Sequence, residues 1–361
     1  MENTTTLLAP KQTLVWDNTS SNSSSIFFYQ TEQVSFLIVL FTLIITGNCT
    51  VLTILFLSGK IRSRMNLFMA NLACADLMVG IFLVLTDVIS KITITWETPD
   101  PGCKIVKFLQ AFSTYASAFS LVALSIDRLS VVIRPLNRAG NGKSWTLIAL
   151  AWIFAALFAF PMLLLFFVKE EQNMKFCKIE FSKQWMWQVY MSLNAAAVFI
   201  IPAVIVAFCY IVIVAVLWRK ANFAMGNDTC SNGCSPQHII NKDGHTVPQQ
   251  KEKKVRWNSS SRGVIPKAKI KTIKMTFVIV LAFIFCWSPY FVFDLLFVYK
   301  QIPDPNSQHI IAINIFIQSL APLNSAANPF IFLLFNFNTV KSACGRHNRH
   351  LYSPPTTQSH L

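Results

Sequence analysis

Seven long apolar stretches dominate the chain, and shorter polar segments separate them. A helix needs about 20 apolar residues to cross a hydrocarbon core roughly 30 Å thick. The stretches are continuously apolar rather than alternating between apolar and polar positions, so helices are expected and a β-barrel is not. The predicted spans are residues 34–58, 66–90, 103–133, 145–168, 187–218, 272–299 and 309–335.

The composition points to a bundle of helices in lipid. Of the 361 residues, 53% are hydrophobic and 13% charged, and the mean hydropathy is +0.48. Such a chain is too apolar for a soluble protein of ordinary charge content. The predicted fold is an all-α membrane protein, a seven-transmembrane helix bundle with a short amphipathic helix after the seventh span. The expected segments are an extracellular tail (1–33), the bundle (34–345), its third cytoplasmic loop (219–271, disordered at 222–262) and a cytoplasmic tail (346–361).

The charges alternate between connections and set the orientation. Lys and Arg concentrate in residues 60–64, 134–143 and 219–274. By the positive-inside rule these connections face the cytosol. The N-terminus is then outside and the C-terminus inside, and the protein is expected in the plasma membrane. The same distribution accounts for the net charge of +15 without a nucleic-acid partner, since the acids lie in the opposite connections at Glu97, Asp100, Glu170, Glu171 and Asp304.

This topology sorts the cysteines and the glycosylation motifs. Cys103 and Cys177 are the cysteines on the oxidising side, so they are predicted to form a disulfide. Cys344, beside basic residues after the last span, is a candidate for palmitoylation. Residues 1–33 contain no apolar stretch, so no cleaved signal peptide is expected. Asn-x-Ser/Thr motifs in this segment predict glycosylation at Asn3, Asn18 and Asn22.

Ionisable side chains inside the apolar stretches point to function, because a charge at the centre of a bilayer costs about 2.5 to 3.5 kcal/mol. Asp127 and Arg128 are adjacent at the far end of the third span, and Asp76 lies in the middle of the second. The polar residues at a depth that matches Asp76 are Ser117, Asn324 and Asn328. These oxygen-bearing side chains suit a hydrated sodium ion or a proton-linked site. A polar cluster that serves packing alone is the alternative.

Four spans contain a proline, which removes one helical hydrogen bond and predicts a kink. The sixth span is the most informative of them. Trp287 lies two residues before the proline and one turn from Phe283. At this position a group that fills the cavity would displace the bulky indole, and the displacement would be transmitted to the bent helix. The four prolines are Pro161, Pro202, Pro289 and Pro329.

One motif per span, in order along residues 30–345, resembles the rhodopsin-like (class A) G-protein-coupled receptors. Within that family, Val106-Lys107-Phe108-Leu109-Gln110 is similar to the vasopressin and oxytocin receptor group. Asp294 stands where vasopressin receptors carry an amide, so the resemblance is strongest to the neuropeptide S and crustacean cardioactive peptide receptors. The motifs are Asn48, the Leu-Ala-x-x-Asp that ends at Asp76, Asp127-Arg128-Leu129, Trp152, Pro202 with Tyr210, Cys286-Trp287-Ser288-Pro289 and Asn328-Pro329-Phe330-Ile331-Phe332.

The resemblance implies an extracellular peptide ligand. Gln110 stands where amine receptors keep an aspartate, and Pro322 stands where opsins keep the retinal lysine, so both kinds of small ligand are disfavoured. Acids around the outer cavity are expected to give it a negative potential, which favours a peptide with a basic residue or a free amino terminus. The implied ligand-binding residues are Asp87, Lys107, Gln110, Glu170, Glu171, Trp287, Phe291, Asp294 and Gln318.

The resemblance also implies coupling to a heterotrimeric G protein, with a calcium or cyclic AMP response. Arg128 would contact the G protein once the sixth span moves away, and Asp127 would restrain it beforehand. Lys269 stands where many relatives hold an acid, so no cross-helix salt bridge is expected to restrain the resting state. Phe332 replaces the usual tyrosine and cannot hydrogen-bond toward Tyr210. The residues implied in coupling are Asp127, Arg128, Pro135, Leu136, Tyr210, Phe283, Trp287, Pro289, Asn328, Pro329 and Phe332.

Further expected partners are arrestin, receptor kinases and membrane lipid, and an allosteric sodium ion at Asp76 is the cofactor considered. An enzyme is not expected, because no nucleophile, base and orienting residue recur together on one side of the membrane. Two other classes remain alternatives. One is a decoy or scaffold receptor that binds peptide without G-protein coupling, which Phe332 keeps open. The other is a seven-span transporter, for which repeats and a polar path are missing.

Overall fold

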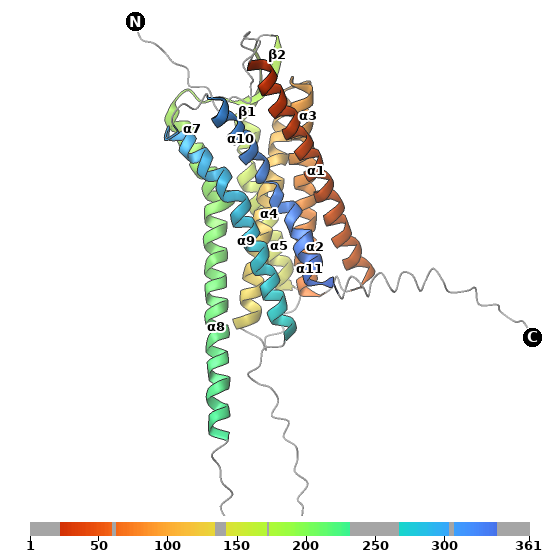
Figure 1. Cartoon of the computed structure of the whole chain (residues 1–361), viewed down its shortest axis with the longest axis vertical. Helices are drawn as coiled ribbons and strands as arrows, with labels where there is room; N and C mark the ends of the chain where they lie inside the picture. Colours follow the sequence, from red (N-terminus) through yellow and green to blue (C-terminus); the bar gives the residue numbers. More distant parts are fainter. Residues whose placement is uncertain are drawn as a thin grey trace, which may run out of the picture.

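The protein is a bundle of long helices with a small hairpin at one end. A computed structural model describes residues 22–59, 63–133, 142–171, 173–231, 267–302 and 307–337. The helices lie side by side, the two-stranded hairpin covers one end, and α8 projects beyond the other (Figure 1). We call these the hairpin end and the basic end.

The elements follow the predicted spans in order. The first three spans are α1 (Asn22–Leu57), then α2 (Arg64–Met78) continued by η1 (Val79–Val84) and α3 (Leu85–Thr93), then α4 (Asp100–Ile133). The fourth span is α5 (Gly142–Ala159) with the short α6 (Met162–Leu165), and the hairpin β1 (Phe166–Glu171) and β2 (Met174–Ile179) follows it. The last three spans are α7 (Gln184–Ala195), η2 (Ala196–Ile200) and α8 (Ile201–Ser231), then α9 (Lys267–Val298), then α10 (Gln308–Leu320) and α11 (Leu323–Phe335).

Six of the spans are helices long and apolar enough to cross a membrane by length and composition. The seventh consists of two helices of 13 residues each, α10 and α11. The break falls at Ala321 and Pro322, where a proline lacks the backbone N–H that would continue the ladder. The predicted seven-helix arrangement is thus present, with its last member divided.

Several boundaries differ from the prediction. Helix α1 begins at Asn22 rather than at 34, because no proline or glycine interrupts residues 22–46. Helix α8 continues to Ser231, so the predicted disorder of 222–262 is wrong over its first ten residues, which include the helix formers Ala224 and Met225. Residues 166–168, assigned to the fourth span, form part of β1 instead.

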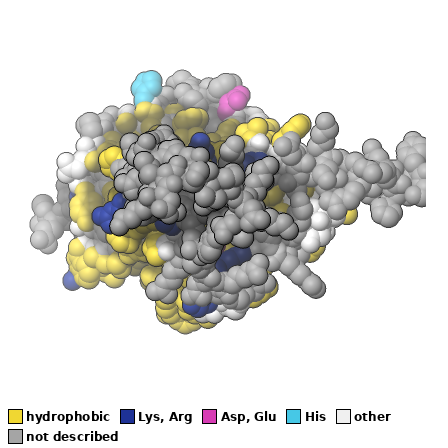
Figure 2. All heavy atoms as spheres, turned by 90° about the horizontal axis from the view of Figure 1, so that it is seen from below, with side chains coloured by type: hydrophobic (Ala, Val, Ile, Leu, Met, Phe, Trp, Pro, Cys, Tyr) yellow, Lys and Arg dark blue, Asp and Glu magenta, His cyan; other side chains and the backbone are white. Residues whose placement is uncertain are grey.

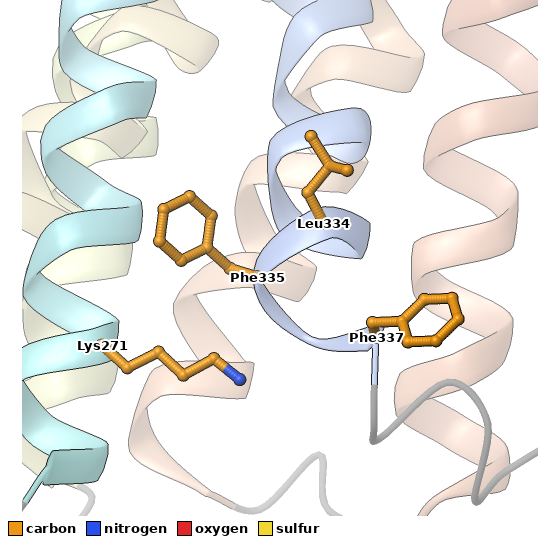
Figure 3. Close-up of a pocket in the computed structure, with 4 residues that line it drawn as sticks. All are labelled: Lys271, Leu334, Phe335 and Phe337. Atoms are coloured by element: carbon orange, nitrogen blue, oxygen red, sulfur yellow. The ribbon is translucent and has the colours of Figure 1, made fainter.

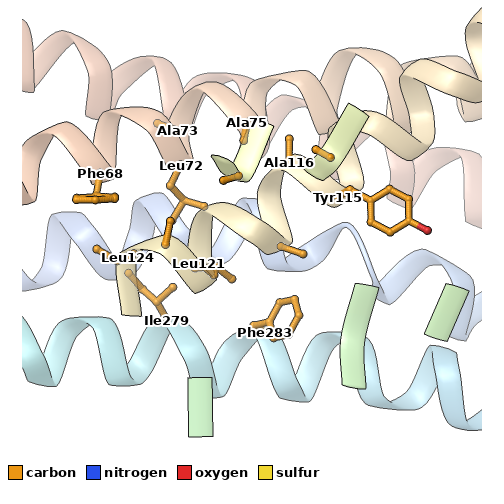
Figure 4. Close-up of a cluster of buried hydrophobic side chains, with 14 of the residues drawn as sticks. Phe68, Leu72, Ala73, Ala75, Tyr115, Ala116, Leu121, Leu124, Ile279 and Phe283 are labelled. Carbon is orange, nitrogen blue, oxygen red and sulfur yellow. The ribbon is translucent and has the colours of Figure 1, made fainter. Parts of the chain in front are cut away.

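Helix α4 lies in the middle of the bundle and packs against α2, α5 and α8. Figure 4 shows the core, where Leu121 and Leu124 of α4 face Leu72 of α2 and Ile279 of α9. Small residues let the helices approach closely, which favours association where lipid provides no hydrophobic drive. These include Ala73, Ala75, Ala116, Ala118 and Ala123, all buried.

The two ends differ in charge. The described acids of the connections lie at the hairpin end, where lysines accompany them. At the opposite end, Asp127 is buried, and Asp228 near the end of α8 is the other acid in the described helix termini. The view of that end in Figure 2 shows mainly Lys and Arg among the visible charged side chains. The described cations there are Arg64, Arg128, Lys143, Arg219, Lys220, Lys271 and Lys274.

Candidate functional site

The hairpin is fixed over its end of the bundle by a covalent bond and two hydrogen bonds. Cys103 in the first turn of α4 forms a disulfide with Cys177 of β2, which confirms the predicted pair. The Val168 N–H donates to the Asp100 carboxylate at 2.9 Å. The Trp96 N–H donates to the Lys175 carbonyl at 2.7 Å. Both strands are therefore held against the start of α4 and the segment before it.

Lysines neutralise most of the hairpin acids. Lys178 donates to the Glu171 carboxylate and holds its pKa below the usual range, and Lys169 lies 3.6 Å from the same carboxylate. Glu170 is exposed and faces Lys175 in the strand register. The hairpin therefore does not supply the negative potential that the sequence led us to expect.

Three predicted ligand-binding residues lie where α3 and α4 meet below the hairpin. The Asp87 carboxylate is 3.8 Å from the ammonium of Lys91, its neighbour one turn away. The Lys107 ammonium lies 5.5 Å from the centroid of the Phe166 ring, a cation–π contact. The Gln110 amide donates to the Thr86 hydroxyl at 2.6 Å. Both signs of charge and one amide therefore face this region.

Deeper in the bundle, a run of aromatic rings joins α9 to η2. Trp287 stacks on Phe291 with ring centroids 5.5 Å apart, and Phe291 stacks on Phe199 at 5.7 Å. Phe199 also lies 6.1 Å from Phe283, one turn below Trp287. Pro289 sits inside α9 beside this stack. A change at the hairpin end that displaces Trp287 would thus act on both α9 and η2 near Pro289.

Two further predicted ligand residues occupy the hairpin-end halves of their helices. Asp294, 8% exposed, interacts with the Tyr290 side chain on the same face of α9. Gln318 lies half-buried on α10, beside Ser319, whose hydroxyl accepts a hydrogen bond from Gln33 of α1 at 3.2 Å. Polar groups from α1, α9 and α10 thus line this half of the bundle.

Asp76 is fully buried in the centre of the bundle and accepts three hydrogen bonds. Ser117 of α4 donates to one carboxylate oxygen at 2.7 Å, and Asn328 of α11 donates to the other at 2.8 Å. Ser325, which the sequence analysis missed, donates at 2.8 Å. Asn324 is buried, and its Oδ1 has no hydrogen-bond partner, as is also true of the Asn328 Oδ1. Carboxylate and amide oxygens of this kind fit a hard cation such as sodium.

At the basic end, Asp127 and Arg128 form the predicted ion pair, and a second cation joins them. The Arg128 guanidinium donates to one Asp127 oxygen. The Arg64 Nε donates to the other at 2.5 Å. The sequence analysis expected no bridge from α9 to Arg128 and did not foresee this one, which joins α2 to Asp127 of α4. The absent acid at Lys269 removes only a bridge from α9, whereas Arg64 supplies one from α2.

Two further predicted coupling residues are Tyr210 of α8 and Phe332 of α11. Tyr210 and Phe332 are both buried. The Tyr210 ring lies 5.5 Å from Phe277, and its hydroxyl is beside Thr276. Between α9 and α11, Lys271 and three apolar side chains line a cavity of about 320 Å³ (Figure 3). The cavity lies at the basic end, and its apolar lining is Leu334, Phe335 and Phe337.

Comparison with known proteins identifies the architecture. Residues 47–332, well over half of the chain, match the family described as 7 transmembrane receptor (rhodopsin family). The chain belongs to that rhodopsin family. Its members are receptors and not enzymes, and as one of them this chain is a multi-pass protein of the plasma membrane.

Curated relatives within the rhodopsin family match nearly the whole chain. The neuropeptide S receptor of Macaca mulatta is 35% identical over 321 residues, which cover 88% of this chain and 80% of the relative. The vasopressin V1b receptor of Homo sapiens is 32% identical over 337 residues, 92% of this chain and 77% of the relative. The mesotocin receptor of Rhinella marina is 32% identical over 324 residues, with coverages of 88% and 78%. The predicted subgroup is thereby confirmed.

Some predicted residues of this rhodopsin-family chain lie outside the described ranges. They are Pro135, Leu136, Asn3, Asn18 and Cys344, and so is the segment expected to form an amphipathic helix. Conversely, the structure adds Arg64, Thr86 and Ser325 to the predicted sets. Arg64 stands directly before the second span, which could have been a signal, but the sequence analysis treats it only as one of the basic residues of 60–64.

Proposed function

We propose that this rhodopsin-family receptor binds an extracellular peptide at the hairpin end and activates a heterotrimeric G protein at the basic end. The observation that carries the proposal is the match of about nine-tenths of the chain to neuropeptide S, vasopressin and mesotocin receptors. The N-terminus is extracellular and the C-terminus cytoplasmic in this proposal, because the basic end then faces the cytosol.

The hairpin end supports a peptide rather than a small amine. Gln110 of α4, an amide and not a carboxylate, lies beside Thr86 of α3. Its amide can exchange the hydrogen bond to Thr86 for one to a peptide backbone group. Lys107 and Asp87 lie nearby on α4 and α3, so a ligand with both charges finds a partner for each. Asp294 is the acid we assign to a basic ligand residue, since Glu171 is already paired with lysines and Glu170 is exposed opposite Lys175.

The basic end supports coupling. Arg128 is held by Asp127 in the arrangement described here, and release of its side chain would expose a cation beside α8 and α9. Helix movement of this kind is a common route by which receptors present a new binding surface. We expect a calcium or cyclic AMP response. Arrestin and receptor kinases are proposed as later partners of the cytoplasmic tail, with anionic lipid beside the basic end.

The test is a measurement of calcium and cyclic AMP in cells that express the chain. Cells are challenged with neuropeptide S, vasopressin and mesotocin, and surface receptor is quantified with an N-terminal tag. A dose-dependent signal that disappears in Arg128→Ala, at equal surface expression, supports the proposal. Binding of a labelled peptide without any signal would instead establish a receptor that does not couple.

A further inference from the structure

We infer that Arg64 is a positioning residue for coupling, which keeps the Asp127 carboxylate paired so that Arg128 can leave it. The inference rests on the proposed coupling function and adds a residue that the motif comparison did not include. Arg64 is the first residue of α2, on the opposite side of Asp127 from Arg128. The three side chains form one chain of charges, with the carboxylate in the middle.

Each oxygen of the Asp127 carboxylate contacts a different arginine. Arg64 occupies one oxygen through its Nε, at 2.5 Å, while Arg128 occupies the other through a terminal nitrogen. The Asp127 side chain is fully buried, and that of Arg64 is 23% exposed. Arg128 makes one further contact, from Nη1 to the Met65 sulfur at 3.6 Å, and its Nε has no partner. Consecutive residues of α2 thus meet consecutive residues of α4.

Arg64 stands where a cation is otherwise unfavourable. The first turn of a helix carries the positive end of its dipole, which favours acids and disfavours Lys or Arg. No acid lies in the first turn of α2, and its N-cap Ser63 makes no side-chain capping bond. The Asp127 carboxylate is the group that compensates this position. The bond to Arg64 therefore also secures the start of α2 against α4.

The consequence concerns the state in which Arg128 has left. A buried carboxylate without a partner is strongly unfavourable, and removal of one member of a buried ion pair is therefore costly. With Arg64 in place, Asp127 retains a cation when Arg128 turns toward a G protein. Because the Asp127 carboxylate is shared between two arginines, it also binds Arg128 less strongly than it would alone. Both effects favour release.

The alternative is that Arg64 locks the resting state. The bridge does not have the connectivity for that role, because it joins α2 to α4 and leaves α9 untouched. Movement of α9 away from the bundle neither stretches nor breaks it. The acid that would tie Arg128 to α9 is absent, since Lys269 stands there.

The test compares Arg64→Gln and Asp127→Asn, alone and together, in the full chain. Lys143→Gln is the matched control, since Lys143 is an exposed cation at the same end of the bundle. Guanine-nucleotide exchange is measured in membranes without ligand and with neuropeptide S, per receptor at the surface. We expect Arg64→Gln to lower exchange about tenfold, less than for loss of a fully buried ionic partner because Arg64 is 23% exposed, and to have little effect in the Asp127→Asn background.

Two results would overturn the inference. Higher ligand-independent exchange in Arg64→Gln would show that Arg64 restrains the resting state. An equal loss in both backgrounds would show a structural role that does not pass through Asp127. If Arg64→Gln fails to reach the surface, Arg64→Lys is measured instead. Because lysine keeps a cation beside Asp127, exchange near the wild-type level supports the inference and a tenfold loss contradicts it. A wild-type chain that behaves like Arg128→Ala would contradict the proposed function itself.

Discussion

Polar residues in the middle of the bundle are arranged to satisfy one buried carboxylate. Asp76 receives donors from two other helices, Ser117 of α4 and both Ser325 and Asn328 of α11. Hydrogen-bond donors aimed at a buried carboxylate offset part of the free energy lost when it leaves water. The unpaired oxygens of Asn324 and Asn328 remain as acceptors, which is the arrangement a cation would use.

We predict that sodium lowers the affinity of the activating peptide in the wild-type chain and has no effect in Asp76→Asn. An ion that binds these oxygens stabilises the arrangement of α2, α4 and α11 described here, and a ligand that needs another arrangement then binds more weakly. Competition binding is measured in NaCl and in N-methylglucamine chloride of equal ionic strength. Equal sensitivity to sodium in both proteins would exclude Asp76 as the site.

The sequence predicted part of this cluster and missed part, for a geometric reason. Asp76, Ser117 and Asn328 follow from their depth in the spans. The bond from Ser325 does not, because α11 begins only after the break at Ala321 and Pro322. A break resets the rotation of the helix, so periodicity counted along the whole seventh span does not show which neighbour of Asn324 faces the carboxylate.

At the scale of elements, a glycine lets two helices pack closely. Among the described glycines, Gly47 of α1 has the least room for a side chain, because Pro329 of α11 lies next to it. A Cβ added to Gly47 would lie 2.7 Å from Cγ of Pro329, a ring that cannot turn aside. The adjacent Asn48 donates from its amide to the Ser325 carbonyl at 3.1 Å. The absence of a side chain at Gly47 thus brings α1 to the helix that carries the Asn328-Pro329 motif.

We predict that Gly47→Ala destabilises the folded receptor by about 1–3 kcal/mol, the range for overpacking of a close contact. The measurement is the thermal midpoint of the purified chain in detergent, followed by surface expression in cells. Gly142→Ala is the control, since nothing lies within 4 Å of its added Cβ and its φ is not positive. Indistinguishable midpoints for the two variants would mean that α1 shifts without loss.

Element boundaries were less predictable than the spans themselves. Hydropathy marks the apolar stretches, but α1 and α8 extend beyond them into polar residues, where hydropathy does not set the length of a helix. The π-helical turn η2 precedes Pro202, whose missing N–H predicts some irregularity but not its form. The turn η1 has no proline and was not foreseen. The hairpin depends on a disulfide and on contacts with α4, neither of which leaves a strand signal.

At the scale of the whole molecule, the charge distribution gives the bundle a direction. At the basic end the described cations outnumber the acids Asp127 and Asp228, while both signs mix at the hairpin end. Counting Lys and Arg in each connection predicts this asymmetry without knowledge of the packing. The orientation of the bundle could therefore be predicted from the sequence. The Arg64–Asp127 bridge was not, because it depends on how α2 and α4 are placed relative to each other.

This direction makes a prediction about modification. If the hairpin end is extracellular, the motifs at Asn3, Asn18 and Asn22 enter the compartment where glycans are attached, whereas those at Asn227 and Asn258 do not. Peptide N-glycosidase should then lower the apparent mass of the wild-type chain and leave the triple Asn→Gln variant of the first three unchanged. A C-terminal tag should bind antibody only after permeabilisation. A tag accessible on intact cells would reverse the bundle, and the peptide and G-protein ends would have to be exchanged.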